Sequence, residues 1–349
     1  MLQKPSYELL GNTKDFLENL ENEIDKAKST IDLQFYTFEA DRVGNHIAKA
    51  LFRAKLRGVR VRFIIDHFID IYHNDHFIKR PRFNRRLHKS IINEWLDTKA
   101  LIAKMAKRGI EIKRTSPLGF LLRLALVRDH KKIVIIDGKT PNRTVAYLGG
   151  ANLSEHNALW NDFMVKMQGD MTPLIQEDFD STWDNKSINK VGAYSDGVVL
   201  TDSRHFSEII PYVKNLIDNA KTRVILESPY LGGKHIKQSL MNAAKRGIDV
   251  SFITPLHNNK KILAPSKKSL KKLTENRVKV YRYAKHGGMT HQKALLVDDM
   301  AVFGSSNFNE FFAGRLCEIN IATLNKSMVL QLEEKLLADI RASKIQKLD

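Results

Sequence analysis

Residues 128–138 have the sequence RDHKKIVIIDG. Within it, residues 133–136 form an apolar and mainly β-branched run, and the Asp-Gly pair that follows is typical of a hairpin turn. The pattern predicts a β-strand that runs into a tight turn. Alternate residues of a strand share a face, so His130 and Lys132 are expected to point the same way. An imidazole beside an ammonium suits a phosphate, because the lysine can hold the anion while the histidine attacks it or gives it a proton.

The same pattern occurs a second time in the chain. A repeated pattern is less readily explained as ordinary surface charge than a single histidine–lysine pair. Residues 290–298, THQKALLVD, keep every offset: a histidine, a lysine two residues on and an aspartate seven residues on. Each copy is followed by a small-residue segment that ends in asparagine, GGAN at 149–152 and GSSN at 304–307. The candidate site residues are therefore His130, Lys132, Asp137 and Asn152 in the first copy, and His291, Lys293, Asp298 and Asn307 in the second.

This doubled pattern resembles the signature of the phospholipase D superfamily, HxKxxxxD occurring twice, each time with a following G-[GS]-x-N. The resemblance implies two similar halves that face each other across a pseudo-two-fold axis, with one catalytic pair from each half meeting in one cleft. It also implies phosphodiester exchange through a covalent phosphohistidine, with His130 as the nucleophile and His291 as the acid. No metal or other cofactor is implied, since two lysines and two amides can neutralise and hydrogen-bond the phosphate.

The rest of the chain repeats as well. A helix is expected at 12–29, with Thr13 as its cap, then a strand at 31–38, a helix at 45–57 that ends at Gly58, and a strand at 59–66. The same order returns with a helix at 207–221, a strand at 223–230, a helix at 235–246 and a strand at 248–254, and each half adds a helix and strand within 101–114 and 270–283. We predict an internally duplicated α/β fold of two mixed sheets flanked by helices, with halves at 1–190 and 191–349.

Carboxylates commonly orient catalytic imidazoles. Asp162 follows Asn152 by ten residues, and Glu318 follows Asn307 by eleven, so the two acids occupy matching places. We predict that they orient the histidines; the alternative is a charge at a strand end.

Two further pairs of residues occupy equivalent positions. Asp137 and Asp298 lie at odd spacing from their histidines, so they are expected to stabilise the turn or the frame of the site rather than touch phosphate. Tyr36 and Tyr230 lie at equivalent strand ends, where they could line the cleft or belong to the core.

The halves differ in two places. Each half has a basic insertion at the corresponding point, and the insertion of the first half is longer. Either a solvated face or an anion-binding role fits these insertions. The first contains Lys79, Arg80, Arg82, Arg85, Arg86, His88 and Lys89 with Phe77 and Phe83, and the second contains Lys260, Lys261, Lys267, Lys268, Lys271 and Lys272. Residues 117–127, PLGFLLRLALV, have no apolar counterpart before His291. They are either core or an apolar lip that enters a membrane interface.

Composition narrows the partners and the location. The 349 residues carry a net charge of +18, which predicts an anionic partner, either an anionic phospholipid membrane surface or nucleic acid. A single cysteine, Cys317, allows no intramolecular disulfide. Residues 1–12 lack the pattern of a signal peptide, and no apolar run is long enough to span a membrane. We expect a cytoplasmic or peripheral membrane protein that acts as a monomer with two pseudo-symmetric halves.

The wider sequence is similar to bacterial cardiolipin synthases over roughly residues 25–335, in segments such as RGVRV at 57–61, LGGAN at 148–152, WND at 160–162 and ESPY at 227–230. The resemblance implies transfer of a phosphatidyl group from phosphatidylglycerol to the headgroup alcohol of another lipid. Asn161 stands where that family usually has Arg, and its usual membrane helices are missing, so hydrolysis of phospholipid by water stays open. The alternative is a metal-independent nuclease of the same superfamily, whose basic loops would contact nucleic-acid phosphates.

Overall fold

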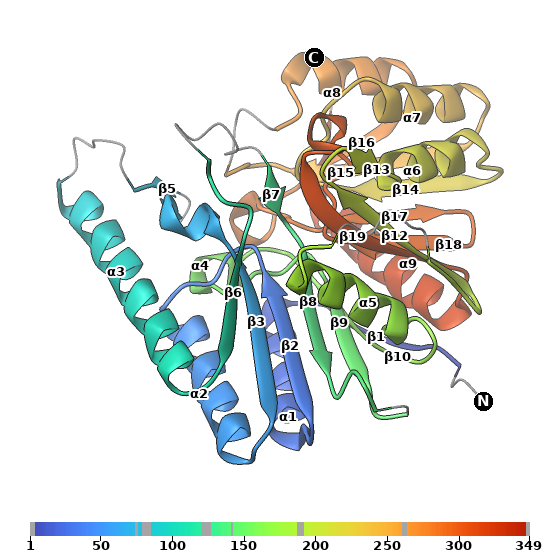
Figure 1. Ribbon diagram of the computed structural model, residues 1–349. Helices are drawn as coiled ribbons and strands as arrows, with labels where there is room; N and C mark the ends of the chain where they lie inside the picture. Colours follow the sequence, from blue (N-terminus) through green and yellow to red (C-terminus); the bar gives the residue numbers. More distant parts are fainter. Residues whose placement is uncertain are drawn as a thin grey trace.

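The computed structural model describes residues 4–73, 76–78, 85–119, 127–140, 142–186, 192–259 and 264–346. Two mixed β-sheets form its centre, and helices cover their outer faces (Figure 1). The first sheet contains β1 (Ser6–Leu10), β2 (Thr30–Phe35), β3 (Arg60–Asp66), β6 (Glu111–Thr115), β8 (Lys132–Ile136), β9 (Val145–Gly149) and β10 (Met164–Gln168).

The second sheet belongs mainly to the C-terminal half of the chain. It contains β11 (Gly192–Tyr194), β12 (Gly197–Ser203), β14 (Arg223–Glu227), β15 (Asp249–Pro255), β16 (Lys279–Tyr283), β17 (Ala294–Val297), β18 (Met300–Gly304), β19 (Leu316–Thr323) and β20 (Ser343–Ile345). Two short strands join it from the side: β13 (Phe206–Ser207) pairs with β12, and β7 (Arg128–Asp129) pairs with β19. Because β7 comes from the first half, the two halves are joined by backbone pairing.

The strand order repeats across the two sheets. The first sheet runs β1-β10-β9-β8-β2-β3-β6, and the second contains β12-β19-β18-β17-β14-β15-β16. In both, the last three strands are parallel to one another and the others pair antiparallel. Parallel neighbours need a crossover, and helices supply it in each half. The predicted internally duplicated fold of two mixed sheets is confirmed.

Helices cover both outer faces and also fill the space between the sheets. The first sheet is covered by α1 (Thr13–Lys26), α2 (Arg42–Leu56) and α3 (Arg85–Lys107), and the second by α6 (Ile209–Asp218), α7 (His235–Lys245) and α8 (Lys267–Glu275). The helices α5 (Thr172–Trp183) and α9 (Lys326–Arg341) pack on the inner faces. One buried cluster joins Ile133, Phe179, Phe303 and Leu332, which come from both sheets and both inner helices. The seam between the halves is therefore a shared apolar core.

Short elements complete the fold. They are η1 (His67–Asp70), β4 (Tyr72–His73), β5 (His76–Phe77), α4 (Glu155–Ala158), η3 (His286–Gly288) and η4 (Glu310–Phe312). Among the described residues, no helix combines the length and the apolar composition that crossing a membrane requires.

Several predicted boundaries are wrong in detail. The cap of α1 is Asn12 rather than Thr13, because the Asn12 side chain accepts a hydrogen bond from the backbone N–H of Asp15. Helix α2 begins earlier than predicted, since Asp41 caps it through the N–H of Gly44. Helix α3 begins at Arg85, so part of the first basic insertion is helical. The predicted C-cap glycine Gly58 is confirmed, with φ +86°.

Some predictions fall outside the described residues. Residues 79–84, 120–126 and 260–263 are among them, so Lys79, Arg80, Arg82 and Phe83 of the first insertion, most of the apolar lip and two lysines of the second insertion are not placed. The predicted boundary at residue 190 also lies in such a segment, 187–191, and stays a prediction.

Candidate active site

The first histidine lies in a gap between two strands. The predicted single strand is interrupted, because β7 ends at Asp129 and β8 begins at Lys132. Asp66 holds the two residues that precede His130. Its two carboxylate oxygens accept hydrogen bonds from the Arg128 guanidinium at 2.9 Å and from the backbone N–H of Asp129 at 2.7 Å. His130 is thus presented at the seam rather than on the face of a sheet.

Each histidine is held by the opposite half of the chain. The His130 Nδ1 atom lies 3.0 Å and 3.2 Å from the two carboxylate oxygens of Glu318, and its backbone N–H donates to the carbonyl of Cys317 at 3.0 Å. The second histidine repeats this arrangement. His291 Nδ1 lies 2.7 Å from Asp162, and its backbone N–H donates to the carbonyl of Asn161 at 2.8 Å. In both cases one two-residue segment orients the ring and the backbone together.

Two buried lysines lie beside the histidines. Lys132 and Lys293 are only 0% and 1% exposed, although lysine is almost never fully buried without a partner. Lys132 donates to the backbone carbonyl of His130, and Lys293 lies 2.9 Å from the Nδ1 atom of His291. Burial lowers the pKa of Lys132 to about 7, the negative charge of Glu318 opposes this, and the positive charge of Lys293 adds to it. The groups from the two halves therefore form one electrostatic cluster.

The two carboxylates differ in their surroundings. Burial raises the pKa of Glu318 to about 7 and that of Asp162 to about 6, against the opposing effects of the two lysines. Ser305 donates a hydrogen bond to Glu318. The equivalent residue of the first half is Gly150, where a Cβ atom would lie 2.3 Å from an Asp162 oxygen. The glycine leaves space for one carboxylate, whereas the serine binds the other.

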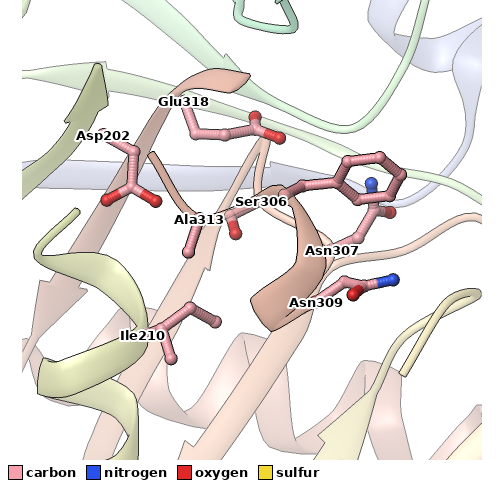
Figure 2. Close-up of a pocket in the computed structure, with 8 residues that line it drawn as sticks. Asp202, Ile210, Ser306, Asn307, Asn309, Ala313 and Glu318 are labelled. Atoms are coloured by element: carbon pink, nitrogen blue, oxygen red, sulfur yellow. The ribbon is translucent and has the colours of Figure 1, made fainter. Parts of the chain in front are cut away.

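The two motif asparagines are buried. Asn152 and Asn307 are 6% and 5% exposed, and their side-chain oxygens have no hydrogen-bond partner within the described part of the chain. Figure 2 shows Asn307 lining a small pocket together with Ser306 and Glu318. Buried amides that the protein leaves unsatisfied are available to a ligand.

Aromatic side chains line both histidines. The Tyr36 ring lies 4.8 Å from the His130 ring, and Trp160 and Tyr230 lie 5.2 Å and 6.4 Å from the His291 ring. The sequence left open whether Tyr36 and Tyr230 line the cleft or belong to the core. In the structure both lie beside the histidines.

The two motif aspartates lie elsewhere. Asp137 accepts hydrogen bonds from the backbone N–H groups of residues 28–30 just before and at the start of β2. Asp298 does the same for residues 221–223 at the start of β14. Both have positive φ, +53° and +50°, at the end of their strand. These carboxylates fasten one strand to the next, so the structure places them as part of the frame and not with the histidines.

Sequence reasoning missed several residues of the site. Ser305 and Trp160 lie inside the sequence motifs that identified the site. Their position in the sequence could therefore have predicted a role for them. Lys335 carried no such signal: it reaches from α9 to donate to the side-chain oxygen of Asn161 at 2.9 Å. Among the described residues, no group of three His, Cys, Asp or Glu side chains is arranged to hold a metal ion.

Comparison with known families agrees with this geometry. The family described as "Cardiolipin synthase, PLD-like domain" matches residues 20–183 and 213–340, which contain both histidines and both carboxylates. The chain belongs to this phospholipase D family. The first matched segment contains most strands of the first sheet, and the second contains most strands of the second sheet.

Similar proteins cover almost the whole of this phospholipase D-family chain. A cardiolipin synthase of Geobacillus sp. (strain WCH70) is 25% identical over 360 residues, covering 95% of this chain and 66% of its own length. Cardiolipin synthase A of Buchnera aphidicola subsp. Acyrthosiphon pisum (strain APS) is 24% identical over 88% of this chain and 63% of its own length. The chain thus spans slightly less than two thirds of these relatives.

Solved structures support the fold. The phosphatidylserine synthase of Haemophilus influenzae Rd KW20 superposes with a TM-score of 0.71 at 14% identity, covering 98% of this chain and 87% of that one. A polyphosphate kinase from Porphyromonas gingivalis gives a TM-score of 0.63 at 16% identity, over 97% of this chain and 50% of that one.

Proposed function

We propose that this protein transfers a phosphatidyl group from an anionic phospholipid to an alcohol, through a phosphohistidine intermediate. The observation that carries the proposal is the crossed pairing of His130 with Glu318 and of His291 with Asp162. A carboxylate on Nδ1 orients each ring and sets its tautomer, and we assign Nε2 as the atom that would act on the substrate. Two such imidazoles suit a displacement in which one attacks phosphorus and the other moves a proton.

The reaction would proceed in two balanced steps. The Nε2 atom of His130 attacks phosphorus, the bond to the headgroup oxygen breaks, and protonated His291 gives its proton to the departing alkoxide. An acceptor alcohol then loses its proton to His291 and attacks the phosphohistidine, which breaks the P–N bond and frees His130. Lys132 and Lys293 would neutralise the non-bridging oxygens throughout, and the side-chain Nδ2 groups of Asn152 and Asn307 would donate hydrogen bonds to them.

A lipid substrate is supported by the relatives and by charge. The curated relatives are named cardiolipin synthases, and the net charge of +18 favours an anionic surface. The proposed partner is therefore an anionic phospholipid membrane, to whose surface the protein binds peripherally. The acceptor is a lipid headgroup alcohol or glycerol in a synthase, and water in a phospholipase D.

A product assay tests the proposal. Vesicles of phosphatidylglycerol labelled in both its acyl chains and its headgroup glycerol would be incubated with the protein, with and without added unlabelled glycerol, beside the variants His130→Ala and His46→Ala. Exchange with glycerol regenerates phosphatidylglycerol, so it is measured as loss of the headgroup label. His46 is a matched control, because it also pairs with a carboxylate, Glu21 at 2.7 Å, but lies exposed on α2. Headgroup-exchanged lipid that disappears only in His130→Ala supports transfer. Phosphatidic acid alone would reassign the protein as a hydrolase, and unchanged lipid in every sample would contradict the proposal.

A nuclease is the second candidate. The observation that favours it is the exposed row of Lys267, Lys268, Lys271 and Lys272 on α8, which could follow a phosphate backbone. Plasmid DNA and RNA would therefore be offered to the same preparations. Cleaved nucleic acid beside untouched lipid would favour this candidate.

A further inference from the structure

Asn161 holds the segment that carries the second histidine. Its backbone N–H donates to the carbonyl of Met289 at 3.2 Å, and its backbone carbonyl accepts from the N–H of His291 at 2.8 Å. Its side-chain amide donates to the hydroxyl of Thr290 at 3.2 Å. Because Asn161 also directly precedes Asp162, its position determines both the backbone of the histidine and the origin of the carboxylate on Nδ1.

An ion pair on α9 contacts this arrangement at two points. The ammonium of Lys335 donates to the side-chain oxygen of Asn161 at 2.9 Å and to the carboxylate of Asp339, one helical turn later, at 2.6 Å. Asp339 is only 4% exposed, and it also accepts a hydrogen bond from the side-chain amide of Gln292 at 3.0 Å. The ion pair therefore touches the residue before the carboxylate and the residue after the histidine.

The first half places its cation differently. The residue after its histidine is Lys131, which donates to Asp178 of α5 at 2.7 Å. Asp178 is thus the counterpart of Asp339. The position four residues earlier, which holds Lys335 in α9, holds Leu174 in α5, and this leucine packs on the core that the two halves share. A repeat that differs at this one turn of helix points to a role specific to the second histidine.

The charge of Lys335 also reaches the carboxylate beside His291. Burial raises the pKa of Asp162 to about 6, and the hydrogen bond from the N–H of Phe163 and the positive charges of three lysines oppose this rise; the lysines are Lys293, Lys132 and Lys335. An ionised carboxylate on Nδ1 stabilises the imidazolium and keeps the ring in one orientation. The ion pair on α9 thus supports the second histidine through geometry and through charge.

We propose that Lys335, held by Asp339, is a positioning residue that acts through Asn161 to hold His291 for proton transfer to the leaving group. The proposal rests on the phosphatidyl-transfer function argued above, in which His291 is the acid. In that step the bond between phosphorus and the headgroup oxygen breaks, its electron pair stays on the oxygen, and the Nε2 proton of His291 moves to it. A ring displaced from this orientation still exists in the protein but delivers its proton less effectively.

The test compares two donors that differ in their need for a proton. Phosphatidylglycerol releases an alkoxide, whereas phosphatidyl-p-nitrophenol releases p-nitrophenolate, which is stable as an anion. In Lys335→Met, the rate of the first turnover should fall about ten- to hundredfold with phosphatidylglycerol. With phosphatidyl-p-nitrophenol it should stay within roughly twofold of the wild type, because no acid is required. Lys335→Arg should recover much of the lost rate, since it restores a cation that can donate.

Two further variants separate positioning from a general loss of structure. Lys214→Met is the matched control, because Lys214 also pairs with an aspartate four residues later, Asp218, but does so on α6. It should leave both rates unchanged. Asn161→Ala removes the acceptor of Lys335 while the ion pair with Asp339 stays, so it should reproduce the dependence on the leaving group even if Lys335→Met does not fold. Equal losses with both donors, or wild-type rates in folded Lys335→Met, would overturn the proposal and leave phosphatidyl transfer intact.

A spectroscopic measurement distinguishes failure of this proposal from failure of the proposed function. If the wild-type protein turns over neither donor, the Nδ1 proton of His291 can still be observed by NMR in protein labelled with 15N-histidine. Hydrogen bonding to Asp162 should place this resonance at low field, and its absence from His291→Gln assigns it. We expect the resonance to shift or disappear in Lys335→Met and to persist in Lys214→Met. An unchanged resonance in Lys335→Met would overturn the positioning role.

Discussion

The Nδ1 atom of His291 lies 2.7 Å from the carboxylate of Asp162, a residue 129 positions earlier and in the other half of the chain. The mirror contact, from His130 to Glu318, is longer at 3.0 Å and involves a carboxyl of higher pKa, about 7 against about 6. The two imidazoles are thus related by the repeat but differ in environment. Such a difference allows one ring to attack and the other to carry a proton.

The first prediction concerns the orientation of His291. Asp162→Asn should lower kcat for lipid turnover by about a hundredfold, because an amide no longer favours the required tautomer and the imidazolium. Thermal unfolding should change little, and Asp162→Glu should recover part of the rate, because it keeps a carboxylate at this position. Steady-state kinetics and a melting curve of each variant give the answer. Wild-type kcat in Asp162→Asn would remove Asp162 from its positioning role.

The second prediction concerns pH. Burial raises the pKa of Glu318 to about 7 and lowers the pKa of Lys132 to about 7, so the carboxylate is ionised above this value while the ammonium is charged below it. The profile of kcat/KM should be a narrow bell with its maximum near pH 7. In Lys132→Arg the alkaline limb should move upward, because a guanidinium stays charged, while the acid limb stays in place. A rate that is flat from about pH 5 to 9 would contradict both assignments.

The third prediction concerns the frame of the site. Asp298→Ala should reduce the free energy of unfolding by about 1–2 kcal/mol, because the backbone N–H groups of residues 221–223 lose their acceptor. Burial alone would raise the pKa of Asp298, but its hydrogen bonds outweigh burial and lower it. A lowered pKa means that this stabilisation is fully present above the ordinary aspartate pKa and is lost as the pH falls from there through the lower pKa of the folded protein. Urea unfolding at pH 7 and pH 3 measures the difference.

The control for the third prediction is activity. Well below the melting temperature, kcat of Asp298→Ala should stay within roughly twofold of the wild type, because the carboxylate touches backbone and not the histidines. A loss of kcat comparable with that of His291→Ala in a folded protein would show that Asp298 acts in the chemistry instead. Asp137→Ala should behave in the same way, since its contacts repeat those of Asp298.

The fourth prediction concerns membrane contact. Leu159 and Phe311 are 71% and 50% exposed, and each directly precedes an aromatic residue of the site, Trp160 or Phe312. Replacing both with Ser should weaken binding to anionic vesicles roughly tenfold, because apolar side chains at an interface contribute through burial in lipid. Leu56→Ser is the control, since Leu56 is 89% exposed at the end of α2. Sedimentation with vesicles measures the effect, and equal losses in the control would refute a specific contact face.

The sequence predicted the repeat well because local patterns carry it. The spacing of apolar residues and the glycines after α2 and α7 located most helices and strands, and the doubled motif located both histidines. Partner choice was beyond such patterns: Asp162 and Glu318 occupy matching places, but only the tertiary fold shows that each serves the histidine of the other half. The cap of α1 also needed coordinates, because Asn12 and Thr13 are adjacent and both residue types are good caps. The break between β7 and β8 could not be predicted either, because it accompanies the pairing of β7 with β19. His130 and its partner Glu318 are 188 residues apart in the sequence.

The crossed pairs also constrain how such a chain could have arisen. Each histidine of this chain contacts the carboxylate of the other half, so a single ancestral half would gain this contact by pairing with a second copy of itself about a two-fold axis. Fusion of the two copies makes that partner permanent, so its concentration no longer matters. It also lets the two sites diverge independently, and the aspartate beside one histidine and glutamate beside the other are the visible result.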